Sequence, residues 1–310
     1  RANLTGTNLS HASLQRAELI AVHSAGDLSD DDTRQCILSN ANLSGANLIG
    51  AKLANADLTQ ATLTNAVISD DTFSPQWRLV HTLVNNQIPN RDLHDATLSD
   101  ANLSGVTLVG ADLRGVNFEG SNLKKANLSR TVLHGAKLQR AELAEIDLSY
   151  ADLRGLDLRG VDLRFAKLDY ARLTSTQVDE SPLLDEKWRI VWPVLNPATS
   201  SKEELTPSTE ASESTLLDLL PNASELRLDL KGQDLSRVDL SGANLRGFDL
   251  TKATLCDSIL DGADLSDAIL EDCDFSGCVW RKTKVTLTQL ENAKNVSPEF
   301  QKSTQAYAAQ

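Results

Sequence analysis

Leucine recurs at every fifth position through much of this 310-residue chain. The clearest run occupies residues 149–173, where polar residues separate Leu153, Leu158, Leu163, Leu168 and Leu173. A helix repeats its apolar face about every 3.6 residues and a strand about every 2, so neither explains a sustained period of five. The period indicates a chain that turns a corner once in each repeat and stacks on itself.

The positions around each periodic Leu or Phe, which we call the centre of its repeat, are also restricted. The residue two before the centre is nearly always small, as at Ala96, Ala101, Ala111, Ala126, Ala136, Ala141, Ala151, Ala166 and Ala171. The residue just before the centre is commonly Asp or Asn, as at Asn102, Asp112, Asn117, Asn122, Asn127, Asp147, Asp152, Asp157 and Asp162. The two residues after the centre are mostly polar or Gly. We therefore predict that two positions of each repeat point inward and three point outward.

These A(D/N)LxG repeats resemble the pentapeptide-repeat family. The resemblance implies an all-β fold, a right-handed quadrilateral β-helix with four repeats to a coil, interrupted here by short helical segments. Centres run over 4–19, 38–73, 93–178 and 230–290. Layers of Leu/Phe and of Ala/Ser fill the interior of such a fold, so we expect no apolar pocket.

The breaks between runs of repeats predict the domain organisation. We expect N-terminal coils over 1–73 with a loop break near 20–37, a helical interruption over 74–90, central coils over 91–180, a helical cap over 181–196, a disordered linker over 197–215, C-terminal coils over 216–290, and a cap helix and tail over 291–310. The linker assignment rests on composition, because 197–215 is rich in Ser, Thr, Glu and Pro and has almost no apolar residues.

Two of the breaks resemble each other. PQWRLVHTLVNN (75–86) aligns with EKWRIVWPVLNP (186–197), which pairs Trp77 with Trp188. The apolar spacing of the first copy fits one face of a helix, and Pro193 is expected to shorten or kink the second. The segment is similar to one in cyanobacterial pentapeptide-repeat proteins. One interpretation is a helix that covers an open end of the coils; the other is a recognition surface built on Trp188 and Trp192.

Residues that could carry chemistry are better explained by the repeat. Cys36, Cys273 and Cys278 occupy the small inward position, Cys256 points outward, and the five His residues share no ligand spacing. The run at 30–32 lacks the spaced acids, Gly turn and distal Glu of a Ca²⁺ loop. No phosphate-binding loop or nucleophile elbow is present in the sequence. We therefore predict no enzyme activity, cofactor or metal site.

Four repeats per coil would stack residues 20 apart, and this generates a candidate protein-binding band. Arg130, Tyr150 and Tyr170 then share one outward column, while Arg154, Arg159 and Arg164 follow one another around a single coil beside Asp residues. Exposed Tyr and Arg are typical of binding hot spots. The alternative interpretation is a stabilising ladder of stacked rings and ion pairs.

Charge separates two possible functions. The net charge of −13 argues against direct binding to nucleic acid or anionic membranes. Some members of the family resemble a DNA duplex and bind DNA gyrase, which would need a continuous anionic face. Residues 91–180, however, carry 12 Lys/Arg against 14 Asp/Glu. We therefore favour a non-catalytic scaffold for protein partners of unspecified identity over a DNA mimic, and leave open self-association through the coil ends.

Several features of the sequence bear on the location of the protein. The sequence contains no apolar run long enough to cross a membrane and no signal peptide at its start. It begins inside a repeat and lacks Met, which suggests a processed or excised chain. Four Cys without an obvious pairing favour a reducing compartment, and we expect the cytoplasm.

Overall fold

The structure, a computed structural model, describes residues 4, 6–14, 37–51, 53, 56–70, 72–86, 91–179, 183–196 and 230–298. The chain forms two compact units, Arg1–Leu184 and Asp185–Gln310, which are described separately. The expected linker (197–215), the start of the C-terminal coils (216–229) and nearly all of the break near 20–37 lie outside the described residues.

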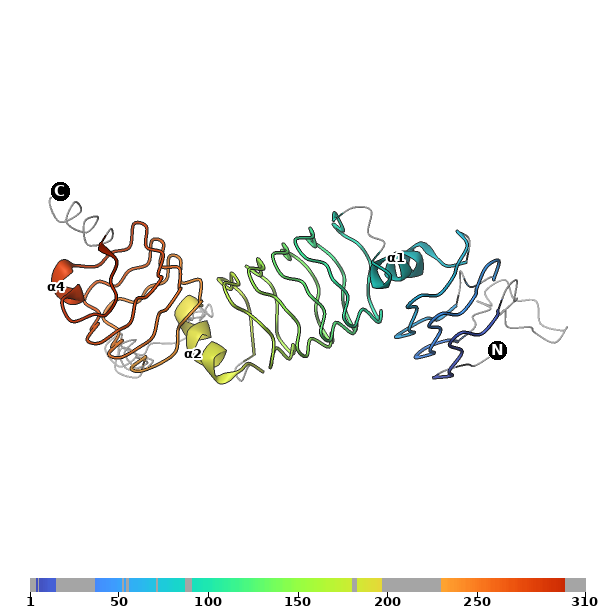
Figure 1. The fold of residues 1–310 in the computed structure, drawn as a ribbon, viewed down its shortest axis with the longest axis horizontal. Helices are drawn as coiled ribbons and strands as arrows, with labels where there is room; N and C mark the ends of the chain where they lie inside the picture. The colour runs from blue at the N-terminus through green and yellow to red at the C-terminus, as the bar shows by residue number, and fades with distance from the viewer. Residues whose placement is uncertain are drawn as a thin grey trace, which may run out of the picture. The chain divides into compact units, whose positions relative to one another are not determined.

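Parallel pairing between residues 20 apart builds the coils. In the central coils, Asp92, Thr97, Asn102 and Thr107 pair with Asp112, Asn117, Asn122 and Asn127, so four repeats complete one coil before the chain returns to the same side. Each side contributes a single paired residue, and no longer strand forms among the described residues. Figure 1 shows successive central coils lying side by side. The fold is a repeat β-helix.

Backbone hydrogen bonds and buried layers explain the five-residue period. The Leu103 N–H donates to the Asn122 carbonyl, and the Asn122 N–H donates back to the Ala101 carbonyl, both at 2.8 Å. The side chains of Ala101 and Leu103 are fully buried. Each repeat therefore gives two inward side chains to the core while its outward residue joins the ladder to the next coil.

The Asp or Asn before each centre shapes the corner that follows. Its side-chain oxygen accepts a hydrogen bond from the backbone N–H two residues later, as from Ser44 to Asn42 (3.0 Å) and from Ser236 to Asp234 (2.9 Å). This local bond is one that Asn and Asp make readily in turns. The next residue takes a left-handed backbone, as at Gly105 (φ 71°), which explains why Gly is frequent there.

The N-terminal coils of the first unit keep their pairing across the break. Asn8 pairs with Asn42 and Ser13 with Asn47, so the partners here are 34 residues apart, where the central coils pair residues 20 apart. At the other end of these coils, the Gln60 N–H donates to the Asp100 carbonyl (2.8 Å). The Gln60 side-chain amide also donates to the Gly120 carbonyl (2.7 Å). The N-terminal and central coils are therefore joined directly along one corner.

Helix α1 (Pro75–Val84) lies against both sets of coils in this unit (Figure 1). It begins with Pro75, whose missing N–H costs nothing in a first turn. Nε2 of the buried His81 lies 2.7 Å from the Ala66 carbonyl of the N-terminal coils, and Gln76 Nε2 donates to the Ser99 carbonyl of the central coils (2.9 Å). The helix supplies donors to carbonyls that have no further coil to pair with.

Helix α2 (Glu186–Leu195) belongs to the second unit. Lys187 Nζ donates to the Ser236 carbonyl (2.5 Å) and lies 3.8 Å from the Asp234 carboxylate, which ties α2 to the start of the C-terminal coils. Pro193 lies inside the last turn, yet α2 has ten residues, as α1 does. The expected shortening is wrong, because so near a helix end the missing N–H removes only one terminal bond.

The C-terminal coils repeat the same pairing from Asp234↔Thr254 to Asp274↔Lys294. The short helix α4 (Leu287–Leu290) replaces one side of the final coil, and its Gln289 Nε2 donates to the carbonyls of Leu265 and Ala268 at 2.9 Å. Thr286 and Gln289 form a capping box that starts the helix. Coil pairing continues past this helix to Lys294, and most of the expected cap helix and tail (291–310) lies outside the described residues, which end at 298.

A charge placed at a centre should disrupt the core. Leu158 is 3% exposed, so Leu158→Asp buries a carboxylate between coil layers and should lower the free energy of unfolding by roughly 3–5 kcal/mol. The neighbouring Arg159→Gln changes an exposed side chain and should have little effect. Urea denaturation of both variants measures the difference, and equal losses would contradict the inward position of the centres.

Two glycines at the same corner position should differ in their tolerance of alanine. Both have left-handed backbones (Gly105 φ 71°, Gly115 φ 67°), so Gly→Ala adds about 1 kcal/mol of strain at each. A Cβ at Gly105 meets nothing within 4 Å, whereas at Gly115 it would overlap the Asp95 carboxylate. Urea denaturation should show the larger loss for Gly115→Ala. Adding Asp95→Ala should remove the excess; an excess that persists would place the clash elsewhere.

Candidate protein-interaction surface

Arg130, Tyr150 and Tyr170 form one outward column on three successive central coils. Arg130 Cζ lies 5.1 Å from the centre of the Tyr150 ring. The Tyr150 and Tyr170 ring centres are 4.6 Å apart with an interplanar angle of 15°, so the rings stack. Tyr150 remains 49% exposed. We call these three residues the Arg–Tyr column; the structure brings them together at the separation that coil stacking imposes.

The corner backbone determines how this column projects. Arg130, Tyr150 and Tyr170 have φ values of 61°, 61° and 59°, the left-handed conformation that Gly holds at equivalent corners such as Gly105. A side chain larger than Asn or Asp is uncommon there and costs backbone energy. Ring stacking and the cation–π contact offset part of that cost, each by about 1 kcal/mol.

The three Arg residues around one coil are each held by the Asp of their own repeat. Nε and Nη2 of Arg154 donate to the two oxygens of Asp152 at 2.8 and 2.6 Å. Arg159 binds Asp157 in the same way (2.9 and 2.7 Å), and Arg164 binds Asp162 (2.9 and 2.6 Å).

These side-chain hydrogen bonds from arginine lower the pKa of all three carboxyl groups below the ordinary value. These three Asp–Arg pairs are therefore a series of exposed, bidentate ion pairs around one coil.

Trp188 and Trp192 do not form an exposed recognition surface. Their exposed fractions are 5% and 4%, because they lie with Val191 on the apolar face of the amphipathic helix α2. Lys187 Nζ lies 5.5 Å from the Trp188 ring centre. The indoles contribute to packing in the structure, which corrects their selection as candidate binding residues.

Sequence reasoning missed an exposed aromatic beside the column. Phe165 is 72% exposed and has a left-handed backbone with φ 64°. It follows Leu163 as Tyr170 follows Leu168, so it occupies the neighbouring corner of the same coil. An aromatic residue two after a centre was the signal that could have identified it.

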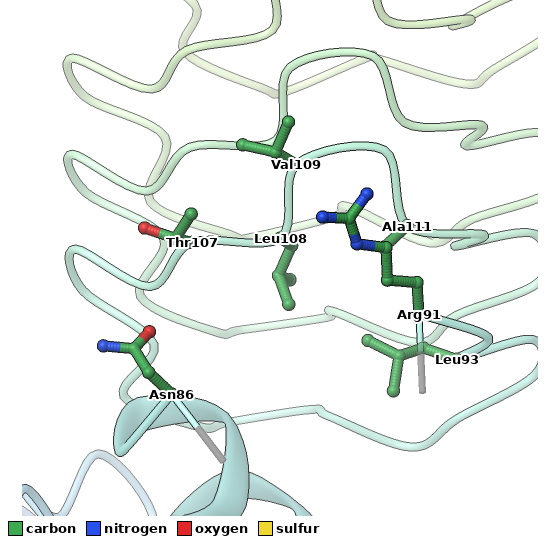
Figure 2. Close-up of a pocket in the computed structure, with 7 residues that line it drawn as sticks. All are labelled: Asn86, Arg91, Leu93, Thr107, Leu108, Val109 and Ala111. Carbon is green, nitrogen blue, oxygen red and sulfur yellow. The ribbon is translucent and has the colours of Figure 1, made fainter. Parts of the chain in front are cut away.

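A pocket of about 220 Å³ lies at the first central coil (Figure 2), whereas no apolar pocket was expected. Its lining mixes polar and apolar side chains: Asn86, Arg91, Leu93, Thr107, Leu108, Val109 and Ala111. Figure 2 shows Asn86, just after α1, and Arg91 lining different sides of it. These residues include no carboxylate, thiol or imidazole, so they offer no acid–base pair for catalysis.

The described cysteines are poor nucleophiles. Burial raises the pKa of the Cys273 thiol, and it raises that of Cys278 to about 12. Burial also raises the pKa of Cys256. Thiols in this state are protonated near neutral pH and neither attack substrates nor bind metals readily. Cys36 lies outside the described residues.

Within the part of the chain that the structure describes, no group of three or more His, Cys, Asp or Glu residues is placed to hold a metal ion. None of the described helices has the length and apolar character needed to cross a membrane.

Comparison with known proteins identifies the repeats. A family model described as pentapeptide repeats matches eight times, over residues 1–22, 34–69, 92–130, 111–149, 126–164, 146–181, 234–272 and 258–294. Together these ranges cover more than half of the chain. A comparison with curated protein sequences finds no match.

Solved structures with similarity to the chain are pentapeptide-repeat proteins or a resistance protein. The pentapeptide repeat protein alr5209 from Nostoc PCC 7120 is 35% identical, covers 31% of this chain and 84% of its own, and has a TM-score of 0.29. HetL, a pentapeptide repeat protein of the cyanobacterium Nostoc sp. strain PCC 7120 involved in heterocyst differentiation regulation, is 22% identical over 94% of this chain and 89% of its own, with a TM-score of 0.16. QnrB1, a plasmid-mediated fluoroquinolone resistance protein, is 15% identical over 82% of this chain and 79% of its own, with a TM-score of 0.15.

The hydrogen bond from Arg114 gives a test of the Asp–Arg pairs. Arg114 Nε donates to Asp112 at 2.8 Å, and its side-chain hydrogen bonds lower the Asp112 pKa from 3.8 to about 2. Arg114→Gln should raise this pKa toward 3.8, which carboxyl NMR titration measures. Because the folded-state pKa is the lower one, the ionised carboxylate favours folding above about pH 4, and this contribution disappears as the pH falls toward 2. An unchanged Asp112 pKa in the variant would contradict the assigned cause.

Proposed function

The chain belongs to the pentapeptide-repeat family, and on this basis we propose that it is a non-catalytic scaffold, a right-handed quadrilateral β-helix that presents side chains to a partner protein. The observation that carries the proposal is the Arg–Tyr column. Its members lie on successive coils, Arg130 and Tyr150 exposed and Tyr170 half-buried, at a spacing that the backbone ladder fixes. Arg and Tyr are the residue types that contribute most often to binding energy at protein interfaces.

A non-catalytic role is supported by the chemistry of the described residues. The pocket beside Asn86 and Arg91 lacks groups that could exchange protons near neutral pH, and the thiols of Cys273 and Cys278 are held protonated. The Arg–Asp pairs on the outer surface are ionised partners in exposed positions, where such pairs contribute little beyond local order. None of these groups forms a nucleophile with an adjacent base.

The alternative is a DNA mimic that binds DNA gyrase or another topoisomerase. The likeness to QnrB1 motivates it, as does the acidic chain, with its net charge of −13. The central coils disfavour it. On the coil that carries Asp152, Asp157 and Asp162, an arginine neutralises each carboxylate, so the surface there does not present the unbroken negative charge of a DNA backbone.

We place the protein in the cytoplasm as part of the same proposal. Cys256, Cys273 and Cys278 are free thiols, and unpaired thiols are retained in reducing compartments.

Affinity capture with three baits tests the scaffold function. The native chain, an Arg130→Ala/Tyr150→Ala/Tyr170→Ala variant and an Arg159→Gln/Arg164→Gln variant are each used to capture proteins from cells that contain the protein, with mass spectrometry as the readout. We expect a partner that the native chain and the Arg→Gln variant retain and the column variant loses. Thermal denaturation of all three baits shows whether the column variant remains folded.

An assay with purified components distinguishes DNA mimicry from the scaffold function. Gyrase subunits captured by all three baits, together with a change in DNA supercoiling when the purified native chain is added to gyrase, would overturn the scaffold proposal and establish DNA mimicry. A chain without effect on supercoiling agrees with the scaffold.

A further inference from the structure

The guanidinium of Arg130 is available to an anionic ligand. It lies over the Tyr150 ring and forms no ion pair with any residue that the structure describes. Stacking on an aromatic face leaves the N–H donors of an arginine pointing sideways, where they can bind a carboxylate through two hydrogen bonds. The first end of the Arg–Tyr column therefore offers a pre-positioned cation.

The other end of the column also carries arginine. Arg172 follows Tyr170 by two residues, and its Nη1 lies 3.3 Å from the Asp152 carboxylate. The same carboxylate already binds Arg154 at 2.6 Å, so two guanidinium groups share one carboxylate. Asp169, next to Tyr170, is the other acid at this end, while Lys167 lies 3.8 Å from Asp147. The three arginines near the column, Arg130, Arg154 and Arg172, outnumber the two acids Asp152 and Asp169, on a chain whose net charge is −13.

Exposed apolar surface accompanies these charges. Val132, two residues after Arg130, is 38% exposed and pairs with Asp152 of the next coil. Tyr150 is 49% exposed, and Phe165 on the neighbouring corner is 72% exposed. Cations at both ends with aromatic and aliphatic surface between them suit a ligand that alternates carboxylate and apolar groups.

We infer that the Arg–Tyr column binds an extended acidic segment of a partner protein, with carboxylates at Arg130 and Arg172 and an apolar side chain on Tyr150 and Val132. The inference rests on the proposed scaffold function and specifies its partner. Arg130 and Arg172 are two coils apart, about 10 Å, and an extended peptide covers this distance in about three residues. The preferred ligand therefore has acidic residues three positions apart.

The charge of the whole chain favours a peptide over a nucleic acid. At physiological salt, charges farther than about 8 Å apart are largely screened, so a short acidic peptide responds to the arginines beside it. A nucleic acid extends over many coils and would meet the acidic remainder of the surface.

Fluorescence anisotropy with the full chain tests the inference. The probe is a fluorescein-labelled peptide of three Glu-Leu-Ser repeats, in which Glu recurs every three residues. The comparison probes are the matching Gln-Leu-Ser peptide and a single-stranded thymidine oligonucleotide with the same number of charges. We expect the Glu peptide to bind at least tenfold more tightly than either comparison probe, and more weakly as salt is raised.

Variants assign the binding to the column. Arg130→Gln and Tyr150→Ala should each weaken binding of the Glu peptide about tenfold or more, whereas Tyr150→Phe, which keeps the ring, should change it little. Arg140→Gln is the matched control, because Arg140 has the same corner conformation (φ 61°) and pairs with Glu119 in another column. If Tyr150→Ala fails to fold, Arg130→Gln carries the test.

Equal binding of the Glu and Gln peptides, or undiminished binding by Arg130→Gln, would overturn the inference. Preference for the oligonucleotide would overturn it in favour of a nucleic-acid ligand. These failures are distinguishable from failure of the scaffold function. If the Glu peptide does not bind but affinity capture still finds a partner that the column variant loses, the scaffold function stands and an acidic segment is excluded as its ligand.

Discussion

The hydrogen-bond ladder between residues one coil apart is the constraint on which the rest of the structure depends. Each coil side contributes a centre N–H and a carbonyl to the next coil, as Leu103 and Asn122 do at 2.8 Å. The ladder keeps every fifth residue in the same layer, which buries the centres and the residues two before them. The pairing survives extra sequence between two paired sides, as between Ser13 and its partner Asn47, which are 34 residues apart.

Such a ladder leaves unpaired carbonyls wherever a run of coils ends, and side chains of the helices donate hydrogen bonds to these carbonyls. His81 and Gln76 of α1, Lys187 of α2 and Gln289 of α4 each place a side-chain nitrogen against a coil carbonyl. Buried apolar residues such as Val80 and Trp188 cover the same regions. Because an open ladder would recruit another chain, these elements also limit uncontrolled association.

Residues on the outer surface are held by local polar contacts, whereas the core is held by apolar packing. Most outward residues bind within their own repeat or to the next coil, as Arg159 binds Asp157, and this leaves few groups available to a ligand. The Arg–Tyr column differs because each of its residues contacts the equivalent residue of an adjacent coil. Arg130 lies over the Tyr150 ring and not beside a carboxylate. Side chains that accept an unfavourable corner backbone and stay exposed are more informative about function than the paired Arg residues around the coil.

The five-residue period by itself determined a chain that turns once per repeat and stacks on itself with Leu and Ala inward, because only these positions recur as apolar or small residues. The β-helix with four repeats per coil, and with it the alignment of Arg130 with Tyr150 and Tyr170, followed from the resemblance of the repeats to the pentapeptide-repeat family. Neither could decide how side chains of one column meet. Only the tertiary structure showed that Arg154 binds Asp152 within its repeat, that Trp188 and Trp192 face the core, and that Pro193 leaves α2 at ten residues. These outcomes depend on rotamers and on which open carbonyls a helix must cover, and both are set by neighbours distant in the sequence.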